Sequence, residues 1–250
     1  MTNNNMYFVA NWKMFGDLAS INSINNVIKL AKSKKFRKIK IVYCPPYTLL
    51  NNFVKKTKNS KISIGAQNCH YESQYGAYTG FISAKMIKDT GSKFVIIGHS
   101  ERRIEGDDDK KINMKIKSAL ESNLKIIFCV GESLKNKKNN KTNQILSRQI
   151  KNGLKKIKKH ENLIVAYEPI WSIGTGILPN NTELEKNIYF IRKNLNKLKN
   201  GKKIKILYGG SVNSNNIRNL TRISGINGFI VGGSSLKSKK FIDIIKKSIN

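Results

Sequence analysis

Eight short apolar runs recur along the 250-residue chain, and charged stretches with roughly helical periodicity separate them. The runs do not alternate apolar with polar residues, which is typical of strands buried on both faces of a parallel sheet. Eight strand–helix repeats within about 250 residues predict a closed (β/α)₈ barrel of the α/β class. We expect its strands at residues 7–11, 40–44, 63–68, 93–98, 125–130, 163–168, 204–209 and 228–232.

An open, doubly wound parallel sheet is the alternative fold. Such a sheet is expected to carry a GxGxxG motif after its first strand, whereas here the first run leads into NWKM. No linker-like segment divides the chain, and we interpret residues 136–144 (NKKNNKTNQ) as the solvated start of one helix. The sequence therefore predicts one catalytic domain over residues 1–250.

The net charge is the unusual figure, because 47 Lys and Arg against 15 Asp and Glu give +32. A surface this basic can attract nucleic acid by releasing counterions. Lysine is spread along the predicted helices, however, and aromatic residues do not alternate with it as a base-stacking surface requires. We therefore interpret the charge as a bias of composition on a solvated outer face, and expect no specific nucleic-acid partner.

A cytoplasmic location is expected. The three cysteines, Cys44, Cys69 and Cys129, contain no CxxC pair, which favours a reducing compartment over a disulfide scaffold or a structural zinc site. No apolar run approaches the ~20 residues of a membrane span, and the first residues lack the features of a secretory signal. We expect no membrane partner.

Polar residues follow several of the predicted strands, where barrels of this kind collect their catalytic groups. Glu168 ends the sixth run before Pro169, and a carboxylate beside an apolar wall can act as a general base once water is excluded. His99 follows the fourth run at the start of a short helical turn, which disfavours an imidazolium. Asn11 ends the first run, and Lys13 follows two residues later. This arrangement predicts an enzyme.

Two other histidines, His70 and His160, are interpreted as structural, His160 lying in a lysine-rich helix.

Glycine-rich motifs follow the sixth, seventh and eighth runs. Gly-Gly-Ser occurs at 209–211 and again at 232–234, where barrels bind phosphate with backbone N–H groups that glycine leaves accessible. Residues 170–177 (IWSIGTGI) are too apolar and glycine-rich for a passive turn, and predict a lid. A static buried loop is the alternative for this segment.

The motifs NWKM, HSERR, CVGE, AYEPIWSIGTG, LYGGSV and GFIVGGSSL, in this order and spacing, resemble the triosephosphate isomerase family. The resemblance extends from about residue 7 to the last helix. It implies a TIM barrel that interconverts dihydroxyacetone phosphate and D-glyceraldehyde 3-phosphate in glycolysis and gluconeogenesis. The reaction would pass through an enediolate, without a metal or an organic cofactor.

The resemblance also implies roles for individual residues. Glu168 would be the base that moves a proton between substrate carbons, and His99 the neutral electrophile that polarises the carbonyl, as in the family. Asn11 and Lys13 would stabilise the enediolate and orient the substrate, with Glu101 beside the lysine. The phosphate would be held by Gly174, Ser211, Gly232 and Gly233.

Three positions depart from the family pattern. Asp107 stands where glutamate is usual, in a segment that is one residue shorter, and Pro179 follows the lid, where it is expected to stiffen the hinge. Phe81 replaces a glutamate that pairs with Arg102 across a dimer interface. These departures concern rate, lid motion and dimer strength, and leave the reaction type unchanged.

The segment 67–81 predicts a protein partner. It carries Tyr71, Tyr75, Tyr78 and Phe81, more aromatic surface than a monomer leaves in water. The resemblance implies a homodimer in which Thr79 reaches the neighbouring site beside Lys13.

Two other functions are considered. Another phosphate-binding barrel would share the glycine pairs but not HSERR together with EPIWSIGTG. A polyanion-binding protein that keeps the barrel would show salt-sensitive binding to nucleic acid.

Overall fold

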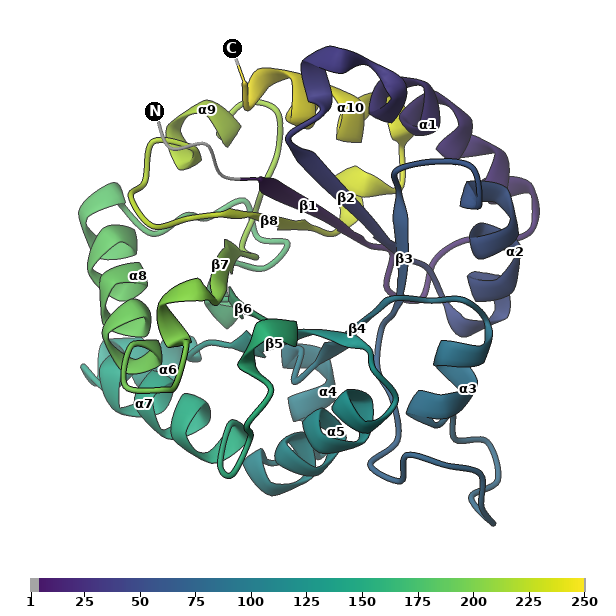
Figure 1. The fold of residues 1–250 in the computed structure, drawn as a ribbon. Helices are drawn as coiled ribbons and strands as arrows, with labels where there is room; N and C mark the ends of the chain where they lie inside the picture. Colours follow the sequence, from purple (N-terminus) through teal and green to yellow (C-terminus); the bar gives the residue numbers. More distant parts are fainter. Residues whose placement is uncertain (1–4, 250) are drawn as a thin grey trace.

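A computed structural model of the chain describes residues 5–249, in which eight parallel strands close into a barrel in sequence order (Figure 1). β1 pairs with both β2 and β8, and this closes the ring. The prediction of a single-domain TIM barrel is confirmed, and each apolar run contains one strand. The strands are Met6–Asn11 (β1), Ile39–Cys44 (β2), Ser63–Ala66 (β3), Phe94–Ile97 (β4), Lys125–Val130 (β5), Leu163–Tyr167 (β6), Lys205–Tyr208 (β7) and Gly228–Val231 (β8).

Helices surround the barrel on the outside (Figure 1). The α-helices are Ile24–Lys32 (α1), Tyr47–Thr57 (α2), Ala84–Asp89 (α3), Ser100–Ile104 (α4), Asp109–Glu121 (α5), Leu134–Lys138 (α6), Thr142–Gly153 (α7), Asn181–Leu195 (α8), Ile217–Leu220 (α9) and Ser238–Lys247 (α10). Short 3₁₀ helices are Ala19–Ser23 (η1), Lys34–Phe36 (η2), His160–Asn162 (η3), Ile170–Ser172 (η4), Gly201–Lys203 (η5) and Gly233–Ser235 (η6).

Two local predictions are wrong. Residues 136–144 are not the start of one helix, because α6 ends at Lys138 and α7 begins at Thr142. Asn140 between them has a left-handed backbone (φ 56°), which asparagine tolerates and which ends a helix. His160 lies in η3 rather than in a lysine-rich helix. It is buried and structural, as predicted, with Nδ1 2.7 Å from the carbonyl of Lys199.

The core has two layers, which explains why the strands lack polar alternation. Side chains such as Val9, Val42 and Ile127 form one cluster, and neighbours such as Phe8 and Ile41 pack in a second cluster with the helices. Successive side chains of a strand point to opposite faces, so both faces of this sheet are buried. Among residues 5–249, no helix is long and apolar enough to cross a membrane.

Helix starts are defined by side-chain caps at the carboxyl-terminal rim of the barrel. Ser83, Asp108, Ser133 and Asn180 each accept a hydrogen bond from the backbone N–H three residues later. These caps fix where α3, α5, α6 and α8 begin. They thereby fix the length of the loops that carry the predicted site.

Candidate active site

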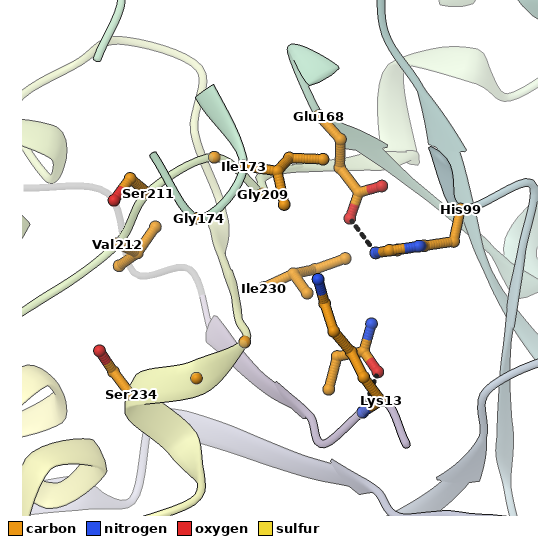
Figure 2. Close-up of a pocket in the computed structure, with 14 residues that line it drawn as sticks. Lys13, His99, Glu168, Ile173, Gly174, Gly209, Ser211, Val212, Ile230 and Ser234 are labelled. Carbon is orange, nitrogen blue, oxygen red and sulfur yellow. Dashed lines mark hydrogen bonds and ion pairs between the residues drawn. The ribbon is translucent and has the colours of Figure 1, made fainter. Parts of the chain in front are cut away.

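The predicted site residues meet in one cavity of about 240 Å³ at the carboxyl-terminal rim (Figure 2). Polar side chains enter from the ends of β1, β4 and β6, and glycine-rich loops after β6, β7 and β8 form the other wall. The eight residues that the sequence predicted all line this cavity: Asn11, Lys13, His99, Glu168, Gly174, Ser211, Gly232 and Gly233. Six further residues complete the lining: Ile173, Gly209, Gly210, Val212, Ile230 and Ser234.

Glu168 provides a buried carboxylate at the end of β6. Its backbone N–H donates to the carbonyl of Val130 (2.8 Å), which continues the sheet pairing one residue beyond the strand. The residue is only 2% exposed, and its Oε2 has no hydrogen-bond partner among the described residues. A buried carboxylate with a free oxygen is suited to accept a proton from a bound molecule.

Two neighbours hold the Glu168 side chain in place. A Cβ at Gly209 would lie 2.6 Å from Glu168 Cγ, so glycine is required there for the carboxylate to fit. The thiol of Cys129 lies against the same carboxylate, and burial together with this negative charge raises its pKa well above the usual value. Cys129 is therefore a neutral neighbour of the Glu168 carboxylate.

His99 faces Glu168 across the cavity (Figure 2), with Nε2 3.8 Å from Oε1 of the carboxylate. His99 is the residue before α4, and its Nδ1 accepts the backbone N–H of Glu101 (3.3 Å). Since Nδ1 is the acceptor, a neutral ring carries its proton on Nε2, the nitrogen that faces Glu168.

Lys13 has a left-handed backbone (φ 54°), which is strained for a residue with a side chain. Its N–H donates to Asn11 Oδ1 (3.1 Å), and its carbonyl accepts from Gln67 Nε2 (2.7 Å). Its ammonium pairs with Glu101 Oε1 (2.7 Å), which confirms the expected proximity of that carboxylate. Because Asn11 Oδ1 already accepts this hydrogen bond, the side-chain NH₂ of Asn11 is the group that can donate to a molecule in the cavity.

The segment 170–177 is anchored at both ends and exposed at its tip. Ser172 is buried, and its hydroxyl donates to the carbonyl of Ile177 (2.6 Å) and lies 3.1 Å from Tyr208 Oη. Gly174 and Gly176 have left-handed backbones, with φ values of 71° and 78°. Ile173 and Gly174 line the cavity. The segment therefore covers one side of the cavity.

Glu132 contacts this segment, and no role was predicted for it from the sequence although it lies in CVGE. Its buried carboxylate accepts a hydrogen bond from Trp171 Nε1 (2.9 Å) and lies 3.2 Å from Tyr167 Oη. Burial raises the pKa of Glu132, and these hydrogen bonds oppose that shift only in part.

Gln67, which donates to the carbonyl of Lys13, is a second residue for which the sequence predicted no role. Both residues follow strands, which is the only sequence signal that could have indicated them.

The loop where β8 leads into η6 forms another part of the cavity wall. Gly232, Gly233 and Ser234 line the cavity there, and the Lys13 side chain lies close to Gly232. A Cβ at Gly210 would lie 2.7 Å from Ser172 Oγ, so this glycine allows β7 to pack under the segment 170–177. Within residues 5–249, no group of three or more His, Cys, Asp or Glu side chains lies close enough to hold a metal.

Acid–base side chains on the carboxyl-terminal rim of a closed parallel barrel are typical of (β/α)₈-barrel enzymes, and this chain is one of them. A family model described as "Triosephosphate isomerase" matches residues 6–248. The triosephosphate isomerase of Thermodesulfovibrio yellowstonii is 41% identical over 246 residues, covering 96% of this chain and 98% of the relative. That of Wolbachia pipientis is 44% identical over 239 residues, covering 96% and 92%.

Solved structures agree with these relatives. The crystal structure of triosephosphate isomerase from Bartonella henselae matches with a TM-score of 0.88 and 34% identity, covering 97% of this chain and 98% of the other. The chain belongs to the triosephosphate isomerase family. It is an isomerase that interconverts dihydroxyacetone phosphate and D-glyceraldehyde 3-phosphate in glycolysis.

Proposed function

We propose that Glu168 and His99 carry out the proton transfers of this isomerisation. The supporting observation is their arrangement: the buried carboxylate of Glu168 has a free Oε2, and its Oε1 lies 3.8 Å from His99 Nε2. Glu168 removes a proton from the substrate carbon next to the carbonyl, and returns it to the neighbouring carbon. His99 Nε2 donates a hydrogen bond to the oxygens on which negative charge develops, and His99 passes the proton of the substrate hydroxyl to the former carbonyl oxygen.

Asn11 and Lys13 stabilise the same charge. The amide of Asn11 and the ammonium of Lys13 line the cavity wall opposite the lid segment, and fixed donors of this kind act on an enediolate without reorganising. Glu101 acts as a positioning residue, because it contacts both Lys13 Nζ (2.7 Å) and, through its N–H, His99 Nδ1. Each step uses groups of this chain, so the proposal includes no metal or organic cofactor.

The substrate phosphate lies against Gly174, Ser211, Gly232 and Gly233 in this proposal. These residues line the cavity away from Glu168's carboxylate, and glycine lets an anion approach the backbone closely. The segment 170–177 closes over the bound substrate. Closure has a chemical purpose, since an enediolate phosphate readily loses phosphate in water.

Replacing Glu168 by glutamine tests the assignment. The amide cannot accept the carbon-bound proton, so kcat should fall by at least the ~10²–10⁴-fold that general base catalysis contributes. The KM and binding of a phosphate-bearing inhibitor should change little, because the phosphate contacts remain. Glu185→Gln, which removes an exposed carboxylate of α8 outside the cavity, is the matched control. Near-parental turnover in Glu168→Gln would show that another group is the base.

We also propose that the active form is a homodimer. The segment between β3 and α3, which includes residues 67–81, extends away from the barrel (Figure 1). Large apolar side chains are exposed on it and on the loop after β1, with Phe81 60% and Met14 94% exposed. A patch of this kind is typical of a protein interface, and a two-fold pair would use the same patch twice. Thr79 at the tip would then reach the partner's site beside Lys13.

Sedimentation at micromolar concentration tests the dimer. We expect a dimer that is little affected by salt, and its dissociation by Phe81→Lys, because this change places a charge in an apolar interface opposite Arg102. Tyr189→Lys, at an exposed position of α8, makes the same charge change outside the patch and should leave the dimer intact. A fully active parental monomer, or equal effects of the two variants, would exclude this interface.

A cytoplasmic location is proposed as well. It is supported by the glycolytic family and by the three cysteines, which are free and buried. Fractionation of the source cells checks it, with activity expected in the cytoplasmic fraction.

A further inference from the structure

The two rims of the barrel differ in charge, although the composition of the chain is basic throughout. The segments that lead from each strand to the next helix form the catalytic rim, and they contain eight basic and eight acidic residues. These segments are 12–23, 45–46, 67–83, 98–108, 131–141, 168–180, 209–216 and 232–237. The catalytic rim is therefore neutral overall.

The opposite rim is strongly basic. The segments that lead from a helix to the next strand contain 16 Lys and Arg and a single acid, Glu161. They are 33–38, 58–62, 90–93, 122–124, 154–162, 196–204 and 221–227. Because all strands are parallel, these segments gather at one end of the barrel. Lysines that are dispersed along the sequence are thus concentrated by the fold.

Two neighbouring segments, 154–162 and 196–204, together carry eight of these 16 basic residues, and we call this pair of segments the lysine face. β6 and β7, the strands that follow them, are paired, and His160 Nδ1 lies 2.7 Å from the carbonyl of Lys199. Each segment contributes four exposed lysines: Lys155, Lys156, Lys158 and Lys159, then Lys197, Lys199, Lys202 and Lys203. None of these eight ammonium groups pairs with a carboxylate in the part of the chain that the structure describes.

The lysine face is a fixed surface rather than a pair of free loops. Arg192 of α8 donates to the carbonyls of Gly201 (3.1 Å) and Ile204 (2.7 Å), which holds segment 196–204 against the helix. This guanidinium is half-buried and has no carboxylate partner among the described residues, so it adds a further positive charge beneath the lysines. Unbalanced like charges held together repel one another, and a bound polyanion would remove that repulsion.

We propose that the lysine face binds the phosphodiester backbone of double-stranded nucleic acid, without sequence specificity. Phosphate contacts from lysine are sufficient for binding of this kind. The face has no exposed aromatic residue to stack on bases and no exposed large apolar side chain to enter a bilayer. It therefore fits a charged duplex better than a single strand or a membrane. The site lies at the other end of the barrel from the catalytic cavity.

Fluorescence anisotropy with labelled duplexes of about 20 base pairs, one DNA and one RNA, tests the proposal from 50 to 200 mM salt. If six or more lysines contact phosphates, affinity should fall on the order of 10³-fold over this range. The duplex bound more tightly shows which nucleic acid the face prefers. Binding near physiological salt should be weak, in the ~10⁻⁴–10⁻⁶ M range of non-specific complexes.

Two variants with equal charge change separate the lysine face from net charge. The first replaces Lys158, Lys159, Lys202 and Lys203 by glutamine. The control replaces Lys135, Lys138, Lys141 and Lys186, which are exposed on the catalytic half. Both should keep isomerase activity. Only the first should lose affinity strongly, with the slope of log K against log salt reduced by about 1 per lysine.

Three results would overturn the proposal. The first is no binding to either duplex at 50 mM salt. The second is an equal loss of affinity in the two variants, which would mean that net charge alone acts. The third is binding to phosphatidylserine vesicles with no binding to a duplex, which would assign the face to membranes.

Discussion

Replacing Lys115 by methionine should be among the most destabilising single changes outside the catalytic cavity. Lys115 on α5 and Asp107 before it form an ion pair with Nζ 2.6 Å from Oδ2, and both side chains are only 6% exposed. The same ammonium donates to Asn68 Oδ1 (3.1 Å), at the base of the segment 67–81. Methionine has a similar volume but no charge, so the buried carboxylate of Asp107 loses its closest ion-pair partner.

The magnitude follows from what remains around Asp107. Breaking a buried pair by removing one partner costs about 3–5 kcal/mol, because the other charge stays desolvated. Arg102 Nε lies 4.0 Å from the same Oδ2, but its side chain is 41% exposed, so it compensates only in part. We therefore expect the free energy of unfolding to fall by about 3 kcal/mol, the lower end of that range.

Chemical denaturation at several protein concentrations measures this loss, since the stability of a dimer depends on concentration. Lys111→Met is the matched control, because Lys111 is exposed on the same helix, and it should change stability by less than about 0.5 kcal/mol. The double variant Lys115→Met, Asp107→Leu should recover most of the loss, since apolar residues often replace a buried pair at little cost. A loss below about 1 kcal/mol in Lys115→Met would refute the reasoning.

Two further predictions concern the supports of the site. Gly209→Ala should lower kcat on the order of 10²-fold with little change in KM, because a Cβ 2.6 Å from Glu168 Cγ displaces the base; unchanged kcat would contradict this. Glu132→Gln tests the raised pKa of Glu132. Native protein binds that proton more tightly than the unfolded chain, so the parent should lose stability relative to Glu132→Gln as pH rises from 4.5 through the native pKa. Denaturation across pH measures the free energy of unfolding of the parent minus that of the variant. A rise of this difference with pH would contradict the prediction.

The fold could be predicted because its main signal is local. Residues such as Ile39–Cys44 form an apolar run, and burial on both faces is the physical reason that the run lacks polar alternation. The third strand is shorter than predicted, ending at Ala66. Gln67 leaves the strand because its side chain donates to the carbonyls of Lys13 (2.7 Å) and Cys44 (2.9 Å). These are contacts of tertiary structure, for which the local sequence has no signal.

The candidate site also contains residues that the local sequence indicates and residues that only tertiary contacts reveal. Asn11, His99 and Glu168 could be predicted because each ends or follows a strand, and parallel strands in a barrel end at one rim. The supports of the site could not. Gln67 acts on Lys13 from 54 residues away, and Glu132 accepts from Trp171, 39 residues away. Such pairs depend on the register of neighbouring strands and on loop lengths, which composition and periodicity do not define.

Phe81 and Asp107, two departures from the family pattern, both concern the surroundings of Arg102. Phe81 removes the glutamate that the family resemblance places opposite Arg102. The Arg102 side chain is 41% exposed, and its Nε has no hydrogen-bond partner among the described residues but lies 4.0 Å from the carboxylate of Asp107 in the same chain. Losing an exposed ion pair costs only ~0–1 kcal/mol, whereas burying the exposed ring of Phe81 contributes ~1.5–3 kcal/mol. The proposed interface therefore depends more on apolar contact than on charge, which is why salt should affect it little.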